Sequence, residues 1–188
     1  MKDSAIKRLV TAALLAALTC IATMIIKIPT PTFGYIHPGD CFVLLCGIVL
    51  GPWTGGLAAG IGSMFSDIFS GYASWAPATL IIKALTAGIA GLLFRYLQRV
   101  MKNRLAAVVL GGIAGESVMV IGYFLYEAAL AAFGSGGFST ATLAAGITSS
   151  ATGIPFNIVQ GVAGILLATF ILPVLRKIPD VREWIANE

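Results

Sequence analysis

The chain has 188 residues, of which 58% are hydrophobic and only 11% are charged, with a net charge of +4. A soluble domain carries about a quarter charged residues, so this composition excludes an ordinary soluble domain. It predicts an integral membrane protein with one domain, 1–188. Ten of the twelve basic residues form three clusters, which argues against a nucleic-acid-binding surface and is typical of cytoplasmic segments beside apolar spans. They are Lys2, Lys7 and Arg8; then Arg95, Arg99, Lys102 and Arg104; then Arg176, Lys177 and Arg182.

Apolar runs along the chain predict an all-α bundle of six helices. The segments are 9–26, 41–50, 54–70, 76–96, 105–131 and 154–173. The first follows a basic start, as a signal peptide would, but its apolar run is longer than the usual 7–15 residues. We therefore expect it to be the first membrane helix.

The second segment is too short to span a membrane, because Gly51 and Pro52 stop it after about ten residues, or about 15 Å of helix. It is either a short helix shielded by its neighbours or half of a re-entrant hairpin with the third segment. Both alternatives return the chain to the same side of the membrane. With all basic clusters inside, both termini are expected in the cytoplasm, and 27–40, 71–76 and 132–153 outside.

Small residues at helical spacing predict close helix packing. Most of the glycine pairs are expected inside the bundle. The alanines of the first helix form a smooth face that could instead meet another membrane protein. They are Ala12, Ala13, Ala16 and Ala17.

Polar and aromatic residues converge in the outer half of the predicted bundle. Ionisable groups within a membrane usually face a bundle interior or a wet cavity. The candidates for a ligand pocket are Tyr35, His37, Asp40, Trp75, Lys83, Tyr123, Glu127, Asn157 and Gln160. The competing interpretation is that Lys83 neutralises Asp67 or Asp40 and that the glutamates hydrogen-bond between helices. We favour that interpretation for Asp67, and leave Glu116 open. Asp40 is also expected to open the second helix, where a carboxylate is favourable.

Motifs for catalysis are absent from the sequence. It contains no GxxxxGK[ST] loop, so the chain cannot hydrolyse ATP itself, and no HExxH or GxSxG motif. The cysteines, Cys20, Cys41 and Cys46, lack metal-site spacing and are expected to be small buried hydrophobes. The sequence therefore predicts neither an enzyme nor a cofactor or metal site.

The stretch from His37 to Gly91 resembles the substrate-binding S components of energy-coupling factor (ECF) vitamin transporters. The shared features are Gly39-Asp40, Leu50-Gly51-Pro52, Ser66-Asp67 and the run WAPATLIIK from Trp75 to Lys83. The likeness extends over nearly the whole chain. It is closest to the branch named for riboflavin, which also includes hydroxymethylpyrimidine and pyridoxine carriers.

This resemblance implies a six-helix protein of the bacterial cell membrane that captures a vitamin from outside. Its partners would be a membrane coupling subunit of the EcfT type and two ABC ATPases. The alanine face would dock the coupling subunit, and the external segment 27–40 would act as a lid. Pyridoxine-type or hydroxymethylpyrimidine-type ligands are expected first, with riboflavin or pantothenate as alternatives.

Two other functions fit the residues alone. The chain could be a stand-alone small carrier or channel, which would transport its substrate without an ATPase. It could also be an assembly protein without a ligand, in which the buried charges only join helices.

Overall fold

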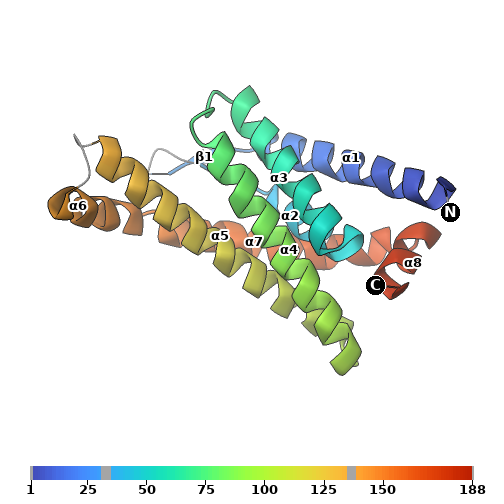
Figure 1. Ribbon diagram of the computed structural model, residues 1–188. Helices are drawn as coiled ribbons and strands as arrows, with labels where there is room; N and C mark the ends of the chain where they lie inside the picture. Colours follow the sequence, from blue (N-terminus) through green and yellow to red (C-terminus); the bar gives the residue numbers. More distant parts are fainter. Residues whose placement is uncertain (1, 31–34, 135–138, 188) are drawn as a thin grey trace.

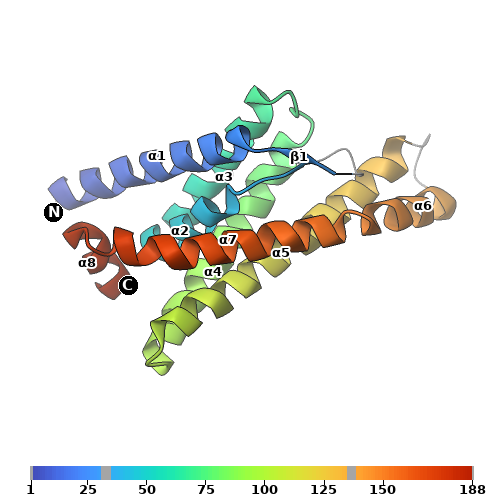
Figure 2. The ribbon, with the colours of Figure 1, turned by 180° about the vertical axis from the view of Figure 1, so that it is seen from behind.

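The computed structural model describes residues 2–30, 35–134 and 139–187, which form a helical bundle. Its elements are α1 (Lys2–Ile25), β1 (Ile28–Pro29), β2 (Tyr35–Ile36), α2 (Asp40–Leu50), α3 (Pro52–Phe69), α4 (Ala76–Val100), α5 (Arg104–Gly134), α6 (Thr140–Ala151), α7 (Ile154–Leu175) and α8 (Pro179–Asn187). Both termini lie at one end of the bundle, and α6 lies at the opposite end (Figures 1 and 2).

The helical class is confirmed, but the predicted count of six is not, since the described residues contain eight helices. The additional ones are α6 and α8. The chain between α1 and α2 also carries an unpredicted antiparallel pair of strands, in which Ile28 lies opposite Ile36. Among the described helices, α1, α4, α5 and α7 are long and apolar enough to cross a membrane.

Helix α6, which was not predicted, begins at a capping box. The Ser139 hydroxyl accepts from the Thr142 amide at 3.1 Å, and the Thr142 hydroxyl accepts from the Ser139 amide at 2.9 Å. This reciprocal pair satisfies amide groups that the first turn of a helix leaves without partners. Helix α8 is held differently, because its Val181 and Ile185 side chains are buried in the core.

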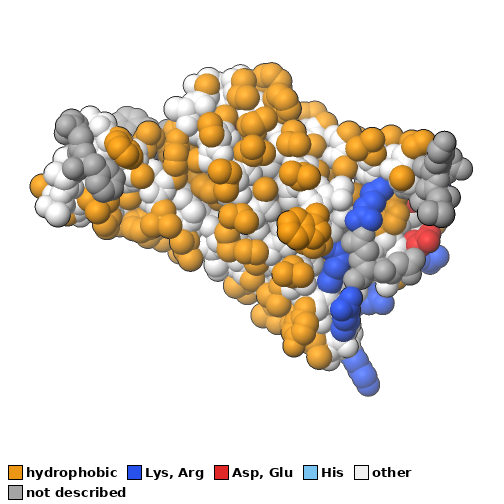
Figure 3. All heavy atoms as spheres, viewed as in Figure 1, with side chains coloured by type: hydrophobic (Ala, Val, Ile, Leu, Met, Phe, Trp, Pro, Cys, Tyr) orange, Lys and Arg blue, Asp and Glu red, His pale blue; other side chains and the backbone are white. Residues whose placement is uncertain are grey.

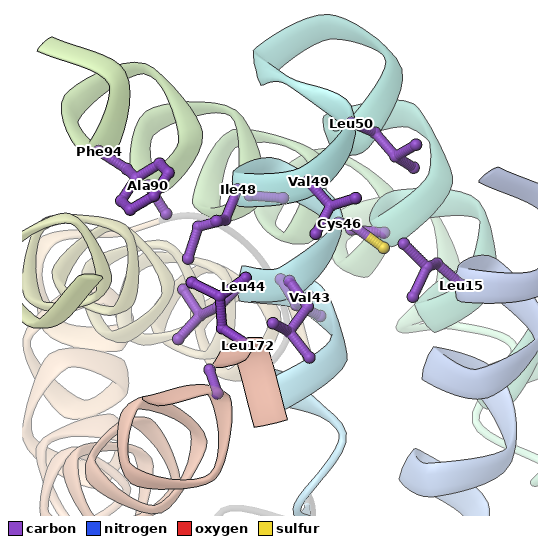
Figure 4. Close-up of a cluster of buried hydrophobic side chains, with 14 of the residues drawn as sticks. Leu15, Val43, Leu44, Cys46, Ile48, Val49, Leu50, Ala90, Phe94 and Leu172 are labelled. Atoms are coloured by element: carbon purple, nitrogen blue, oxygen red, sulfur yellow. The ribbon is translucent and has the colours of Figure 1, made fainter. Parts of the chain in front are cut away.

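The short helix α2 lies in the middle of the bundle, and ten of its eleven residues are buried. Its side chains meet Leu15 of α1, Phe94 of α4 and Leu172 of α7 (Figure 4). The structure therefore supports a short helix shielded by its neighbours. At about 16 Å, α2 does not cross a membrane by itself.

Arginines from other helices bind the last carbonyl groups of α2. Arg8 Nη2 donates to the Leu50 oxygen at 2.6 Å, and Arg95 Nη1 lies 3.5 Å from the Gly47 oxygen. The last carbonyls of a helix lack partners within it and carry a partial negative charge. These contacts explain how the chain breaks at Gly51 inside a bundle.

Glycine allows α2 and α4 to pack backbone against backbone. A Cβ placed on Gly91 would lie 2.2 Å from the Gly47 carbonyl oxygen, closer than real Cβ contacts come. The predicted role of the paired glycines in close helix packing is confirmed at this crossing.

Candidate ligand-binding site

A small polar cavity lies between α3, α4, α5, α7 and the β2 segment. Its volume is about 40 Å³, which is room for a few water molecules. The lining residues are Thr30, Tyr35, His37, Asp67, Tyr72, Trp75, Thr79, Tyr123, Glu127, Asn157 and Gln160. Seven of the nine predicted pocket residues are among them, and the other two, Asp40 and Lys83, are not.

Aromatic rings form one wall of the cavity. The ring of Trp75 lies 6.2 Å from that of Tyr123 and 5.3 Å from that of Tyr126, between centroids. The Tyr123 hydroxyl donates to Thr79 Oγ1 at 3.2 Å. Such rings offer flat apolar surfaces to a heteroaromatic ligand, while their hydroxyls remain hydrogen-bonded.

Tyr35 of β2 covers the cavity. Its hydroxyl donates to Asp67 Oδ1 at 2.8 Å, and its ring lies 4.9 Å from that of Tyr72. Lys27 donates to Ser70 Oγ and lies 5.1 Å from the centre of the Tyr35 ring. The short strand pair is thus tied to the end of α3. Of the predicted lid 27–40, positions 31–34 lie outside the described residues.

The base of the site is a buried ion pair between Lys83 and Asp40, whose side chains are both fully buried. Gln160 Nε2 donates to Asp40 Oδ2 at 2.6 Å, and Gln160 Oε1 accepts from the His37 amide at 2.9 Å. Asp67, which we expected to balance charge, instead bonds Tyr35. As expected, Asp40 opens α2 and places a carboxylate in its first turn, although Gly39 is the N-cap and makes no side-chain cap bond.

His37 sits on the cavity wall in its neutral form. Its Nδ1 accepts from the Gly39 amide at 3.1 Å, so this nitrogen carries no proton. Burial lowers the pKa of His37 to about 3; the Asp40 carboxylate opposes this shift, and Lys83 and Lys27 add to it. The ring can therefore present an Nε2–H donor over the physiological pH range.

Asn157 and Glu127 add polar groups from α7 and α5, and each side chain is 8% exposed. Asn157 lines the cavity, where its amide can both donate a hydrogen bond to a ligand and accept one.

Several lining residues were not predicted. Thr79 lies one turn before Lys83 on the same face of α4, a spacing that could have identified it. Thr30 and Tyr72 lie outside helices, where periodicity carries no information. Glu116 is buried but does not line the cavity, and neither carboxylate oxygen has a hydrogen-bond partner among the described residues.

Only part of the predicted alanine face of α1 is exposed in the structure. Ala12 is buried in the core, and Ala16 is half-buried against Gly62 of α3. Ala13 and Ala17 are exposed. Because residues one turn apart share a helix face, these two still form a surface that a partner could reach.

Similarity to known proteins identifies the class. The structure resembles a solved protein described as "Structure and mechanism of the S component of a bacterial ECF transporter", with a TM-score of 0.63 over 91% of this chain and 96% of that one. The two sequences are 21% identical, so this likeness concerns the fold alone. The fold is that of a transporter S component, a multi-pass membrane protein.

The sequence profile of the family "ECF-type riboflavin transporter, S component" matches residues 3–177. The chain belongs to this family, which is one of transport subunits and not of enzymes. It is also 35% identical to an "Uncharacterized protein in gap 3'region" from Pyrococcus woesei. That match covers 82% of this chain and 97% of the relative.

Proposed function

We propose that the chain is the high-affinity substrate-binding subunit of an ECF-type ABC importer and captures a small heteroaromatic B vitamin or its precursor. The observation that carries the proposal is an aromatic-walled cavity whose lining also includes the polar side chains of Asn157, Glu127 and His37. Trp75 and Tyr123 would contact the ring of the ligand, while Asn157, Glu127 and His37 would bond its hydroxyls or ring nitrogens.

The size of the cavity favours a single-ring ligand of the pyridoxine or hydroxymethylpyrimidine type. A cavity of about 40 Å³ must expand to hold any vitamin. A ligand with a single ring requires less displacement of the aromatic wall than a tricyclic flavin does. Riboflavin is the second candidate, because the family description names it. Pantothenate is less favoured, since Lys83, which would balance its charge, is paired with Asp40.

We also propose the remaining parts of the importer. A membrane coupling subunit of the EcfT type would dock on the exposed Ala13 and Ala17, and two ABC ATPases would supply energy. We place the basic end and both termini in the cytoplasm and the cavity toward the outside of a cell membrane, a bacterial plasma membrane in our proposal. Segment 27–40 is proposed as the lid.

Equilibrium binding of a vitamin panel to the purified chain in detergent tests the proposal. One of pyridoxine, hydroxymethylpyrimidine, riboflavin and pantothenate should bind tightly. Asn157→Ala should weaken that binding about fivefold, since one hydrogen bond contributes about 1 kcal/mol. Asn103→Ala, which lies outside the cavity, should leave it unchanged. Equal affinity of Asn157→Ala and the unmodified chain would remove Asn157 from the pocket.

Reconstitution separates this function from a stand-alone carrier. The chain alone in liposomes should bind the vitamin without accumulating it. Uptake without ATPases would contradict the assignment as a subunit.

A further inference from the structure

A continuous groove runs along α3 and α4 to the basic end of the bundle, away from the polar cavity. Its apolar part has a volume of about 370 Å³. It is lined by Pro52, Trp53, Gly56, Leu57, Ala84, Leu85, Gly88, Ile89 and Leu92. A Cβ on Gly56 would lie 2.9 Å from the Ala84 carbonyl oxygen, and one on Gly88 would lie 3.3 Å from the Pro52 carbonyl oxygen, so these glycines let α3 and α4 approach closely beneath the groove.

The groove opens into a cleft with three arginines. The cleft has a volume of about 470 Å³ and shares Pro52, Trp53 and Leu92 with the apolar part. Its basic lining residues are Arg8, Arg95 and Arg99. Figure 3 shows the same change of character: hydrophobic side chains cover the bundle, and Lys and Arg gather at the end that carries the termini.

The order of side chains along α4 matches the order of chemical groups along an amphiphilic molecule. Leu85, Leu92, Tyr96 and Arg99 follow one another at intervals that keep them on one side of the helix. The sequence of side chains is thus apolar, then aromatic, then cationic. Trp53, which is 86% exposed, lines the cleft together with Tyr96. Trp and Tyr are enriched where the hydrocarbon core of a membrane meets its head groups.

We propose that this groove binds one anionic phospholipid, with an acyl chain between α3 and α4 and the phosphate at the arginines. Guanidinium groups form paired hydrogen bonds with phosphate oxygens. Basic pockets on the cytoplasmic side are known to bind anionic head groups. Arg8 and Arg95 also bind the last carbonyls of α2, so the lipid would contact the residues that support the Gly51 break. The inference does not depend on which vitamin is bound.

Native mass spectrometry of the full chain, released from detergent micelles, tests the lipid site. Titration with dioleoylphosphatidylglycerol should give one tightly bound lipid, and dioleoylphosphatidylcholine should bind more weakly. Arg99→Gln should weaken binding of the anionic lipid about fivefold, as expected for one basic residue at a membrane surface. Arg104→Gln is the control, because Arg104 lies at the same end but does not line this cleft.

A second variant tests the apolar groove without touching the charges. Leu57→Trp should fill the groove and reduce lipid binding, whereas Leu125→Trp, on exposed surface of α5, should not. Inorganic phosphate at millimolar concentration should fail to displace the lipid. Displacement by phosphate alone would show a simple anion site and overturn the proposal.

Two other results would also overturn it. One is equal binding of the two lipids. The other is equal binding by the Arg99→Gln and Arg104→Gln variants. If Arg99→Gln instead abolished only co-purification with the coupling subunit, the cleft would be a protein interface. Vitamin binding, measured in parallel, keeps this result separate from the fate of the proposed function.

Discussion

At the scale of single residues, the base of the cavity is a set of mutually satisfied polar groups. Asp40 bonds both Lys83 and Gln160, and Gln160 accepts from the backbone amide of His37. These bonds hold α2, α4, α7 and the β2 segment in register beside the cavity. Asn157 and Glu127 line the cavity, whereas Asp40 and Lys83 do not.

Removing Lys83 should therefore destabilise the chain rather than only weaken binding. Lys83→Met leaves the Asp40 carboxylate buried without its cation, which costs about 3–5 kcal/mol in comparable cases. Asp40→Asn in the same chain should restore much of this loss, because the amide oxygen can still accept from Gln160. Unfolding in detergent, compared for the single and double variants, measures the difference. An unchanged midpoint for Lys83→Met would contradict the buried pair.

The stability contributed by His37 should depend on pH. Its folded-state pKa of about 3 lies below the ordinary 6.5, so the unfolded chain binds a proton that the folded chain does not. This contribution is fully present above pH 6.5 and is lost as the pH falls toward 3, by up to about 1.4 kcal/mol per pH unit.

Unfolding of the unmodified chain and of His37→Asn between pH 8 and 4 measures this contribution. Asparagine can still accept from the Gly39 amide but does not titrate. The stability difference between the two proteins should shrink in acid. A constant difference would mean that His37 titrates normally.

At the scale of elements, α2 determines how the bundle is built. It is short, almost wholly buried and reached by α1, α3, α4 and α7, so each of these helices packs on the same central element (Figure 4). Its length follows from the Gly51 break at one end and from the chain segment around His37 at the other. That segment forms the cavity wall where a longer helix would otherwise continue.

The crossing of α2 and α4 should tolerate no added methyl group. Gly91→Ala would press a Cβ against the Gly47 carbonyl, and overpacking of this kind typically costs about 1–3 kcal/mol. Gly134→Ala is the matched control, because a Cβ there meets no atom within 4 Å. Thermal unfolding midpoints in detergent should fall for the first variant only. An unchanged or raised midpoint for Gly91→Ala would contradict the close contact with Gly47, because alanine has the higher helix propensity.

At the scale of the whole molecule, the two ends of the bundle differ in chemistry. The cavity lies toward one end, while the basic residues, both termini and the arginine cleft lie at the other (Figures 1 and 3). One helix, α1, presents exposed alanines along its length between these ends. The proposed subunit would thus bind its ligand, its partner and a lipid on separate surfaces.

Docking on α1 can be tested apart from ligand binding. Ala13→Leu with Ala17→Leu should abolish co-purification with the coupling subunit, since two added isobutyl groups prevent close helix approach. Ala141→Leu with Ala145→Leu, an exposed pair at the same spacing on α6, is the control. Vitamin affinity should stay the same in both. Intact association of the α1 variant would place the interface elsewhere.

The sequence by itself determined the membrane class, the approximate apolar segments and most of the cavity residues. These features depend on composition and on spacing along single helices, which are local properties. Asn157 and Gln160, for example, were predicted because they share one face of a helix that is otherwise apolar.

Only the tertiary structure decided which polar groups satisfy one another. Lys83 could pair with Asp40 or Asp67, and nothing local distinguishes the two acids. The outcome depends on how α4 packs against α2 and α3, which is a matter of distances between helices far apart in sequence. The same holds for the alanines of α1, where the packing of α3 buries Ala12 and leaves Ala13 exposed.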